Sequence, residues 1–299
     1  MTNDKLKFMP QEEGFLGIEK KYLSGPEDAK AIIVPFGLEA SVCYGGGTRV
    51  GPAAIIKASH QLEFFDEEHW CETYQKFGVA TLEAPAIGIS IPDALNQLEK
   101  IVQEVLDQDK FPLILGGEHS ITAGGIRPFV RKYPNLAILH FDAHADLRDG
   151  FEGEHYSHAA ALRRVMDNPI STLISCGIRN ISASEIPYLE ENKDRITIHW
   201  AKDLKKWNIE EIVAPLKDRP VFITFDVDGF DSSLMQATGT PEPGGIFWQD
   251  AMDIIKAAAN ISNIVGADIV ELAPIKQLHS CDFLAAKLAY KILGYSLNK

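Results

Sequence analysis

Short apolar runs rich in β-branched residues alternate along this chain with longer segments of helical period. A buried parallel sheet produces this pattern, because its strands are apolar on both faces and each crossover between them needs a helix. We therefore predict an α/β fold with a mostly parallel central sheet. The expected strands are residues 31–36, 111–115, 136–141, 172–177, 196–200, 221–226 and 266–272, and the expected helices lie near 52–64, 94–108, 121–132, 157–167, 248–260 and 283–295.

No linker-like stretch, internal repeat or shift in composition divides the 299 residues. Because α/β folds often use about 250 residues or more as one domain, we expect a single domain over 1–299. Residues 1–25 are expected to be an N-terminal extension of that domain. For this extension and for the acidic stretch 64–72, packing, capping of the site and subunit contact all remain open.

Charge and apolar content exclude some classes of partner. The net charge of −13 argues against nucleic acid, whose phosphates need clustered Lys and Arg. The N-terminus lacks the apolar core of a signal peptide, and no apolar stretch is long enough to span a membrane. Four scattered cysteines are expected to be reduced core residues (Cys43, Cys71, Cys176 and Cys281). We expect a cytoplasmic protein.

Polar clusters follow three of the predicted strands. Ligands of open α/β sheets bind outside the carboxyl ends of the strands, so these clusters mark the expected site. In an extended segment the side chains at i, i+2 and i+4 share a face, which favours convergence within each cluster. The candidate residues are His119 after the second predicted strand, Asp142, His144 and Asp146 after the third, and Asp226 and Asp228 at the end of the sixth.

Four carboxylates at neighbouring strand ends repel one another unless cations compensate them. Two imidazoles and four carboxylates form a mixed N/O ligand set that suits Mn²⁺, with Co, Ni, Fe and Zn as alternatives. Two such ions about 3.5–4 Å apart generate hydroxide from water near neutral pH. The sequence therefore predicts a site for two divalent metal ions.

Flanking residues fit the same site. Glu271 ends the last predicted strand, and its carboxylate could hold a guanidinium in planar, bidentate geometry. Gly116 and Gly117 allow close approach of the backbone just before His119. The turn-rich loop 238–245 follows the sixth strand and is of the kind that often carries function.

Four motifs together resemble the ureohydrolase superfamily, which includes arginases and agmatinases. They are GGEHS at 116–120, FDAHAD at 141–146, FDVDGFD at 225–231 and GTPEPGG at 239–245, and their order and spacing match over residues 30–295. The resemblance implies a three-layer α/β/α sandwich, two Mn²⁺ ions per subunit and a homo-oligomer, usually a trimer or hexamer. One departure is Gln236, where relatives commonly have proline.

The resemblance also implies roles for individual residues. A metal-bridging hydroxide attacks the guanidinium carbon; Asp146 holds that hydroxide and Glu271 binds the guanidinium. His158 resembles a histidine assigned to proton shuttling or substrate contact, with His155 as a nearby competitor. Among the metal ligands, Asp142 and Asp226 would bridge the two ions, His119 and Asp146 would complete one, and His144 and Asp228 the other.

The distal end of the substrate is set by loops around the site. The stretch after the third cluster lacks the arginase pattern and contains Asp149, Glu152 and Glu154, which favours a ligand that ends in an ammonium. Arg148 could instead hold a carboxylate. We expect agmatine, hydrolysed to putrescine and urea, with 4-guanidinobutyrate, aminopropylagmatine and arginine as alternatives. A binuclear phosphoesterase and a non-catalytic family member are remoter hypotheses.

Overall fold

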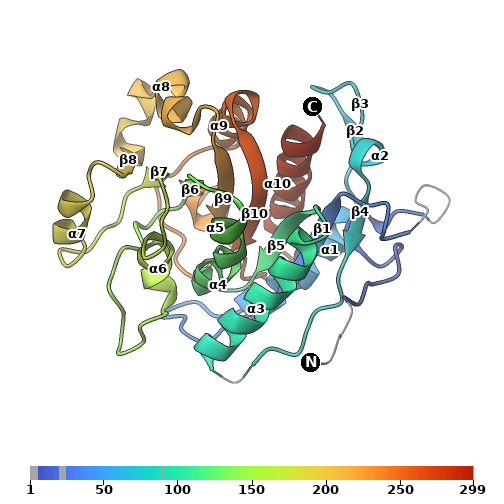
Figure 1. The fold of residues 1–299 in the computed structure, drawn as a ribbon, viewed down its shortest axis with the longest axis horizontal. Coiled ribbons are helices and arrows are strands. Elements are labelled where there is room, and N and C mark those ends of the chain that lie inside the picture. The colour runs from blue at the N-terminus through green and yellow to red at the C-terminus, as the bar shows by residue number, and fades with distance from the viewer. Residues whose placement is uncertain (1–5, 20–24, 89, 299) are drawn as a thin grey trace.

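The computed structural model describes residues 6–19, 25–88 and 90–298. Its centre is an eight-stranded sheet in the order β4-β1-β5-β10-β9-β6-β7-β8, in which every neighbouring pair is parallel (Figure 1). The strands are β1 (Ala31–Phe36), β4 (Val79–Thr81), β5 (Phe111–Gly116), β6 (Ala137–Phe141), β7 (Thr172–Ile178), β8 (Ile196–Trp200), β9 (Pro220–Asp226) and β10 (Asn263–Val270). All seven predicted strands are present; β4 was missed.

Helices cover both faces of the sheet, as predicted. Alternate residues of β1 enter different cores: Ile33 joins the core under α1, α9 and α10, whereas Ile32 joins the core under α3 and α6. This division into two cores makes three layers (Figure 1). The helices are α1 (Gly51–Ser59), α2 (Tyr74–Phe77), α3 (Ile91–Leu106), α4 (Thr122–Gly125), α5 (Arg127–Lys132), α6 (Ala161–Met166), α7 (Ile186–Glu191), α8 (Ile209–Val213), α9 (Trp248–Ile261) and α10 (His279–Leu297).

Three predicted helices differ in detail. The helix expected near 52–64 is α1, which already ends at Ser59. The helix expected at 121–132 is divided into α4 and α5, with Pro128 in the first turn of α5, where its missing N–H is tolerated. The helix expected at 157–167 starts as a 3-10 turn capped by the Ser157 hydroxyl, which accepts from the N–H of Ala159, and continues as α6. The missed helices α2, α7 and α8 have too few residues to show a period.

Both stretches whose role was open pack against the domain. In the extension, the N–H of Leu16 donates to Ser59 Oγ of α1 at 2.7 Å; residues 1–5 and 20–24 lie outside the described residues. The acidic stretch forms the hairpin of β2 (Phe65–Asp66) and β3 (Cys71–Glu72). Its Asp66 carboxylate lies 2.9 Å from Nζ of Lys291 on α10.

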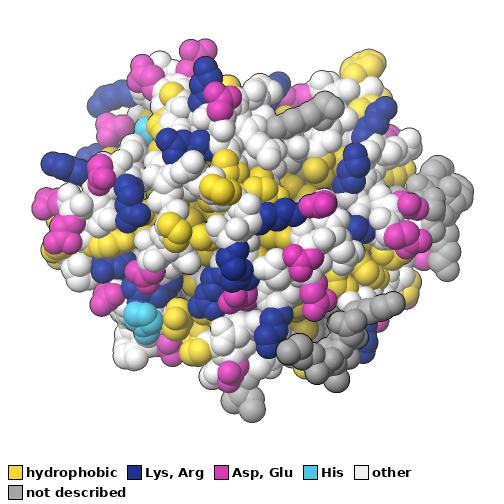
Figure 2. All heavy atoms as spheres, in the orientation of Figure 1, with side chains coloured by type: hydrophobic (Ala, Val, Ile, Leu, Met, Phe, Trp, Pro, Cys, Tyr) yellow, Lys and Arg dark blue, Asp and Glu magenta, His cyan; other side chains and the backbone are white. Residues whose placement is uncertain are grey.

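The described surface, helices and cysteines can be compared with the features expected from the sequence. On the face drawn in Figure 2, acidic side chains lie among the basic ones, unlike the clustered Lys and Arg that nucleic acid requires. None of the described helices is both long and apolar enough to cross a bilayer. The four cysteines are free, as predicted, although Cys43 is exposed rather than in the core.

Candidate active site

The predicted site residues meet because four neighbouring strands end at one edge of the sheet. In the order β5-β10-β9-β6, these strands lead into His119, Glu271, Asp226 and Asp142 respectively. The last strand of the chain, β10, lies between β5 and β9, and this puts Glu271 beside His119. Parallel pairing therefore places all three polar clusters and Glu271 on the ligand-binding side of the sheet.

His119 points into a group of carboxylates. Its Nδ1 atom lies 3.1 Å from oxygens of both Asp142 and Asp146, and 3.5 Å from Asp226. Yet this buried nitrogen has no hydrogen-bond partner of suitable geometry among the described residues. Metal ligands are expected to have this arrangement, in which a nitrogen and several carboxylate oxygens surround one point without bonding to each other.

A second group forms around His144, whose Nδ1 lies 3.1 Å from Asp228 Oδ2 and 3.5 Å from Asp142 Oδ1. Asp142 faces both groups, since its other oxygen, Oδ2, is the one near His119. The two groups thus share a carboxylate, as a site for two ions requires. The resemblance to ureohydrolases implies a binuclear divalent metal site, and this cluster of His and Asp side chains fits it.

Without metal ions, several side chains of the site have strongly shifted pKa values. Burial raises the pKa of Asp226 well above its usual range, and the nearby carboxylates of Asp228 and Asp142 raise it further. Burial lowers the pKa of His144, but the carboxylates of Asp228 and Asp142 outweigh burial and raise it to about 12. Divalent cations remove this conflict, because they favour ionised carboxylates and neutral imidazoles.

Buried polar groups hold His119 in place from behind. Its Nε2 lies 3.0 Å from Thr224 Oγ1 on β9, and Thr122 lies next to Thr224 and donates to Asp268 at 2.8 Å. A hydrogen bond from Nε2–H to Thr224 leaves the Nδ1 lone pair free for a metal. None of these residues was predicted: Thr224 and Asp268 lie far from His119 in the sequence, and Thr122, three residues after it, carries no motif.

His140 is a buried histidine that the sequence analysis also missed. Its Nε2 lies 2.9 Å from Asp142 Oδ2 and its Nδ1 lies 3.0 Å from Ser175 Oγ. Both ring nitrogens are thus engaged, so His140 orients Asp142 rather than binding metal itself. Its position two residues before Asp142 on β6, on the same face, was the available signal.

The prediction that residues 142–146 are extended was wrong. Strand β6 ends at Phe141, and Asp146 has a left-handed backbone with φ of 50°. Glu271, just after β10, is also left-handed, with φ of 65°. Such conformations in non-glycine residues cluster at functional sites, and here the loop rather than the strand period brings the side chains together.

The glycine pair before His119 permits the expected close approach of backbones. A Cβ on Gly117 would lie 1.9 Å from the carbonyl oxygen of Leu38, so no other residue fits there. This contact fixes the end of β5 against the loop that follows β1. Gln236, the departure from the family pattern, is exposed on the loop after β9 and leaves the cavity intact.

Glu271 is buried at the floor of the site. Its Oε1 accepts the backbone N–H of His119 at 2.7 Å. Burial raises its pKa to about 8, and the carboxylates of Glu118 and Asp228 add to the rise. A cation bound beside Glu271, whether a guanidinium or a metal, favours the ionised carboxylate.

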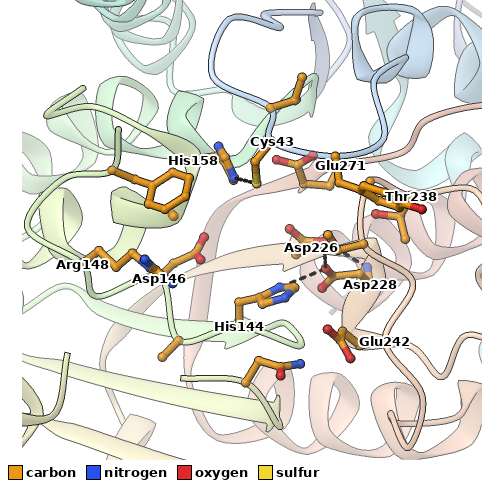
Figure 3. A pocket seen from close by; sticks show the side chains of 18 of the residues that line it. Cys43, His144, Asp146, Arg148, His158, Asp226, Asp228, Thr238, Glu242 and Glu271 are labelled. Carbon is orange, nitrogen blue, oxygen red and sulfur yellow. Dashed lines mark hydrogen bonds and ion pairs between the residues drawn. The ribbon is translucent and has the colours of Figure 1, made fainter. Parts of the chain in front are cut away.

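A cavity of about 330 Å³ opens over these residues (Figure 3). His144, Asp146, Asp226, Asp228 and Glu271 line it, whereas His119 and Asp142 lie beneath. Of the two competing histidines, His158 lines the cavity, while the ring of His155 contacts Arg164 away from it. This volume is in the range of small-molecule sites.

The acidic side chains of the loop predicted to recognise the distal end (Asp149, Glu152 and Glu154) do not line the cavity. Asp149 instead pairs with Arg164 at 2.9 Å, and Glu154 accepts the N–H of Tyr156. Two acids from elsewhere take that place: Glu185 and Glu242. Glu185 uses both oxygens to hold backbone N–H groups of neighbouring loops, whereas the carboxylate of Glu242 has no such partner among the described residues.

Arg148 is the one Lys or Arg among the described residues that line the cavity. Its guanidinium lies 4.8 Å from the centre of the Phe151 ring, a cation–π contact. A second arginine, Arg179, was missed by the sequence analysis; it holds the loop that carries Glu242. Its guanidinium donates to six backbone carbonyls, which belong to Gly177, Asp228, Gly229, Phe230, Glu242 and Pro243.

Comparison with known proteins agrees with this architecture. The chain is 35% identical over 97% of its length to an N(1)-aminopropylagmatine ureohydrolase of Synechocystis, 95% of which is covered. It is 37% identical over 83% of its length to an agmatinase of Bacillus cereus, 85% of which is covered. An agmatine ureohydrolase structure from Thermoplasma volcanium superposes with a TM-score of 0.81 at 29% identity, over 91% of each chain.

The family comparison covers nearly the whole chain. Residues 29–294 match the model of the arginase family, close to the range 30–295 over which the four motifs had indicated a resemblance. The α/β/α fold predicted from that resemblance is also confirmed by the sheet and its two helical layers. The chain therefore belongs to the arginase family and is a hydrolase of amidino C–N bonds.

Proposed function

We propose that this protein hydrolyses agmatine to putrescine and urea, with two Mn²⁺ ions held by His119, Asp142, His144, Asp146, Asp226 and Asp228. The observation that carries the proposal is the cavity itself. The predicted ligand side chains and Glu271 come from four adjacent strand ends and meet at its floor (Figure 3). Mixed imidazole and carboxylate ligands without a thiolate suit Mn²⁺.

The charges left after metal binding support a dicationic substrate. Two divalent ions balance the four aspartates of the cluster. Glu271 and Glu242 then remain at the cavity as carboxylates for an organic ligand. In Figure 3, Glu242 lies beyond Asp228 as seen from Glu271, so one acid can hold the guanidinium and the other the distal ammonium.

When bound, the two metal ions would lower the pKa of a water molecule and supply positive charge next to the reacting guanidinium carbon. The protein's own residues supply orientation and proton transfer. Glu271 fixes the plane of the guanidinium, and Asp146 accepts a hydrogen bond from the attacking water. His158, beside the cavity, carries a proton toward the leaving amine.

A specific observation favours aminopropylagmatine as a second substrate. The relative of that name in Synechocystis aligns with 97% of this chain, a wider span than the agmatinase of Bacillus cereus. Both substrates combine a guanidinium with a cationic tail, so both fit Glu242. Guanidinobutyrate and arginine carry a carboxylate and would need Arg148 to leave its contact with Phe151.

Three further properties belong to the proposal. Residues 1–299 act as one catalytic domain, which is supported by the single large sheet. Subunits assemble as a trimer or hexamer, and the enzyme works in the cytoplasm. The assembly follows from the family resemblance, and the cytoplasmic location is supported by the four scattered, free cysteines.

The test is urea release from a panel of guanidines by protein loaded with Mn²⁺. We expect the highest kcat/KM with agmatine, followed by aminopropylagmatine, and little turnover of arginine or guanidinobutyrate. Glu242→Gln should raise KM for agmatine about 10-fold, since the ammonium loses a charge-assisted hydrogen bond. Faster turnover of either carboxylate-bearing substrate would refute the specificity, and no urea from any guanidine would refute the function.

A further inference from the structure

A buried carboxylate that takes no part in the proposed reaction lies directly behind the cavity. Glu118 is fully buried and immediately precedes His119. Its Oε2 accepts the backbone N–H groups of Ala40 at 2.5 Å and Ser41 at 2.6 Å. Its Oε1 accepts the hydroxyls of Ser41 at 2.8 Å and Ser120 at 2.6 Å. Glu118 therefore fixes the loop after β1 in which Ser41 lies.

Ser41 connects Glu118 to His158. Its Oγ accepts the backbone N–H of His158 at 2.9 Å and lies 3.2 Å from Nδ1 of the same residue. Among the described residues a second hydroxyl lies near Nδ1, that of Ser157, at the longer distance of 3.4 Å; its oxygen also accepts the N–H of Ala159. Nε2, on the opposite edge of the ring, lies 3.2 Å from Cys43 Sγ, at the cavity (Figure 3).

Counting hydrogens along this chain favours one state of the imidazole. An ionised carboxylate only accepts hydrogen bonds, so the single hydroxyl hydrogen of Ser41 is committed to Glu118. Ser41 Oγ can then only accept from His158. A hydrogen on Nδ1 makes the 3.2 Å contact a hydrogen bond, whereas a bare Nδ1 would face the Ser41 oxygen lone pair and keep only the longer contact with the Ser157 hydroxyl. In the neutral imidazole this leaves a bare lone pair on Nε2, which faces the cavity and the Cys43 thiol.

We propose that Glu118 is a positioning residue that acts through Ser41 to hold His158 in the tautomer with hydrogen on Nδ1 and a free lone pair on Nε2. The inference rests on the proposed role of His158 in proton transfer. It adds that Nε2 is the ring nitrogen that accepts the proton. The tautomer is set by Ser41, which is 117 residues from His158, and by Glu118, which is 77 residues from Ser41. Substrate must displace the Cys43 thiol to reach this atom.

A double-mutant cycle tests the connection. Ser41→Ala should lower kcat/KM for agmatine about 10-fold or more, as loss of an orienting group does, with the change mainly in kcat. In a His158→Asn background the same substitution should change kcat/KM less than 2-fold, because the group it orients is gone. Ser41→Thr, which keeps the hydroxyl, should restore activity. Equal losses in both backgrounds, or no loss in either, would overturn the inference.

Ser120→Ala is the matched control. It removes the other hydroxyl from the same Oε1 of Glu118 but does not touch Ser41 or His158. We expect its kcat/KM to stay within about 3-fold of the wild type. A loss as large as that of Ser41→Ala would show that Glu118 acts through general packing and would contradict the proposal.

The tautomer can be observed directly by nitrogen-15 NMR of histidine-labelled protein loaded with diamagnetic Mg²⁺ or Zn²⁺, the His158 signals being identified by their loss in His158→Asn. Neutral His158 should show hydrogen on Nδ1 in the wild type and a mixture of tautomers in Ser41→Ala and Glu118→Gln. Hydrogen on Nε2 in the wild type would overturn the inference. This readout does not depend on turnover, so an inactive wild type refutes the proposed function without affecting the tautomer result.

Discussion

Replacing Thr224 by valine tests whether the metal site depends on groups behind its ligands. Valine has nearly the shape of threonine, so the change removes one hydroxyl and leaves packing in place. In the wild type that hydroxyl lies 3.0 Å from Nε2 of His119, a side chain that is 1% exposed. The substitution therefore leaves a buried ring N–H without a partner and frees the imidazole to turn.

The expected cost follows from that geometry. An unsatisfied buried donor costs about 1–3 kcal/mol, and loss of a group that orients a metal-binding histidine lowers metal affinity about 10–100-fold. We expect Thr224→Val to bind one of the two Mn²⁺ ions about 10–100-fold more weakly, which corresponds to about 1.4–2.7 kcal/mol. Activity should return at high Mn²⁺ concentration, because the ligands themselves are intact.

Isothermal titration with Mn²⁺ measures this directly. The control is Thr172→Val at the start of β7, which also removes a buried hydroxyl, but one that donates to the Arg195 carbonyl on the neighbouring chain segment. Both variants should lose some stability to thermal unfolding, and only Thr224→Val should lose metal affinity. Equal Mn²⁺ affinity in Thr224→Val and the wild type would refute the reasoning.

Other perturbations have equally definite outcomes. Removing the metal with a chelator should abolish urea release and lower the melting temperature, because the buried carboxylates then repel one another. Added Mn²⁺ should restore both activity and melting temperature. A fully active chelated protein would contradict the metal assignment. Arg179→Lys should lower the free energy of unfolding by about 2–4 kcal/mol in urea titrations, because one ammonium cannot satisfy six carbonyls; a loss below about 0.5 kcal/mol would show the contacts are dispensable. Burial raises the pKa of Asp66, but the N–H of His69 and the ammonium of Lys291 outweigh burial and lower this pKa to about 2. The ionised Asp66 therefore stabilises the fold above about pH 4, and this stabilisation is lost as the pH falls through 2. Acid unfolding should therefore be steep between pH 4 and 2 in the wild type and shallower in Lys291→Met, and identical curves would refute this.

The strands and motifs could be predicted because their signals are local. A strand buried on both faces is apolar throughout, and a run such as residues 31–36 shows this without knowledge of its neighbours. The candidate metal ligands could be found because each follows such a run. Elements of four to six residues, such as α2 and α7, gave no signal, since a period needs several turns to appear.

What the sequence determined by itself was the set of elements and the chemistry carried at their ends, because both depend on residues close together in the chain. The tertiary structure decided which strands are neighbours: β10 inserts between β5 and β9 and puts Glu271 against His119. It also decided which groups surround the candidate site residues, such as Thr224 behind His119 and Glu118 behind Ser41. Those pairs are separated by 105 and 77 residues, and only the packing of the whole sheet brings them within hydrogen-bonding distance.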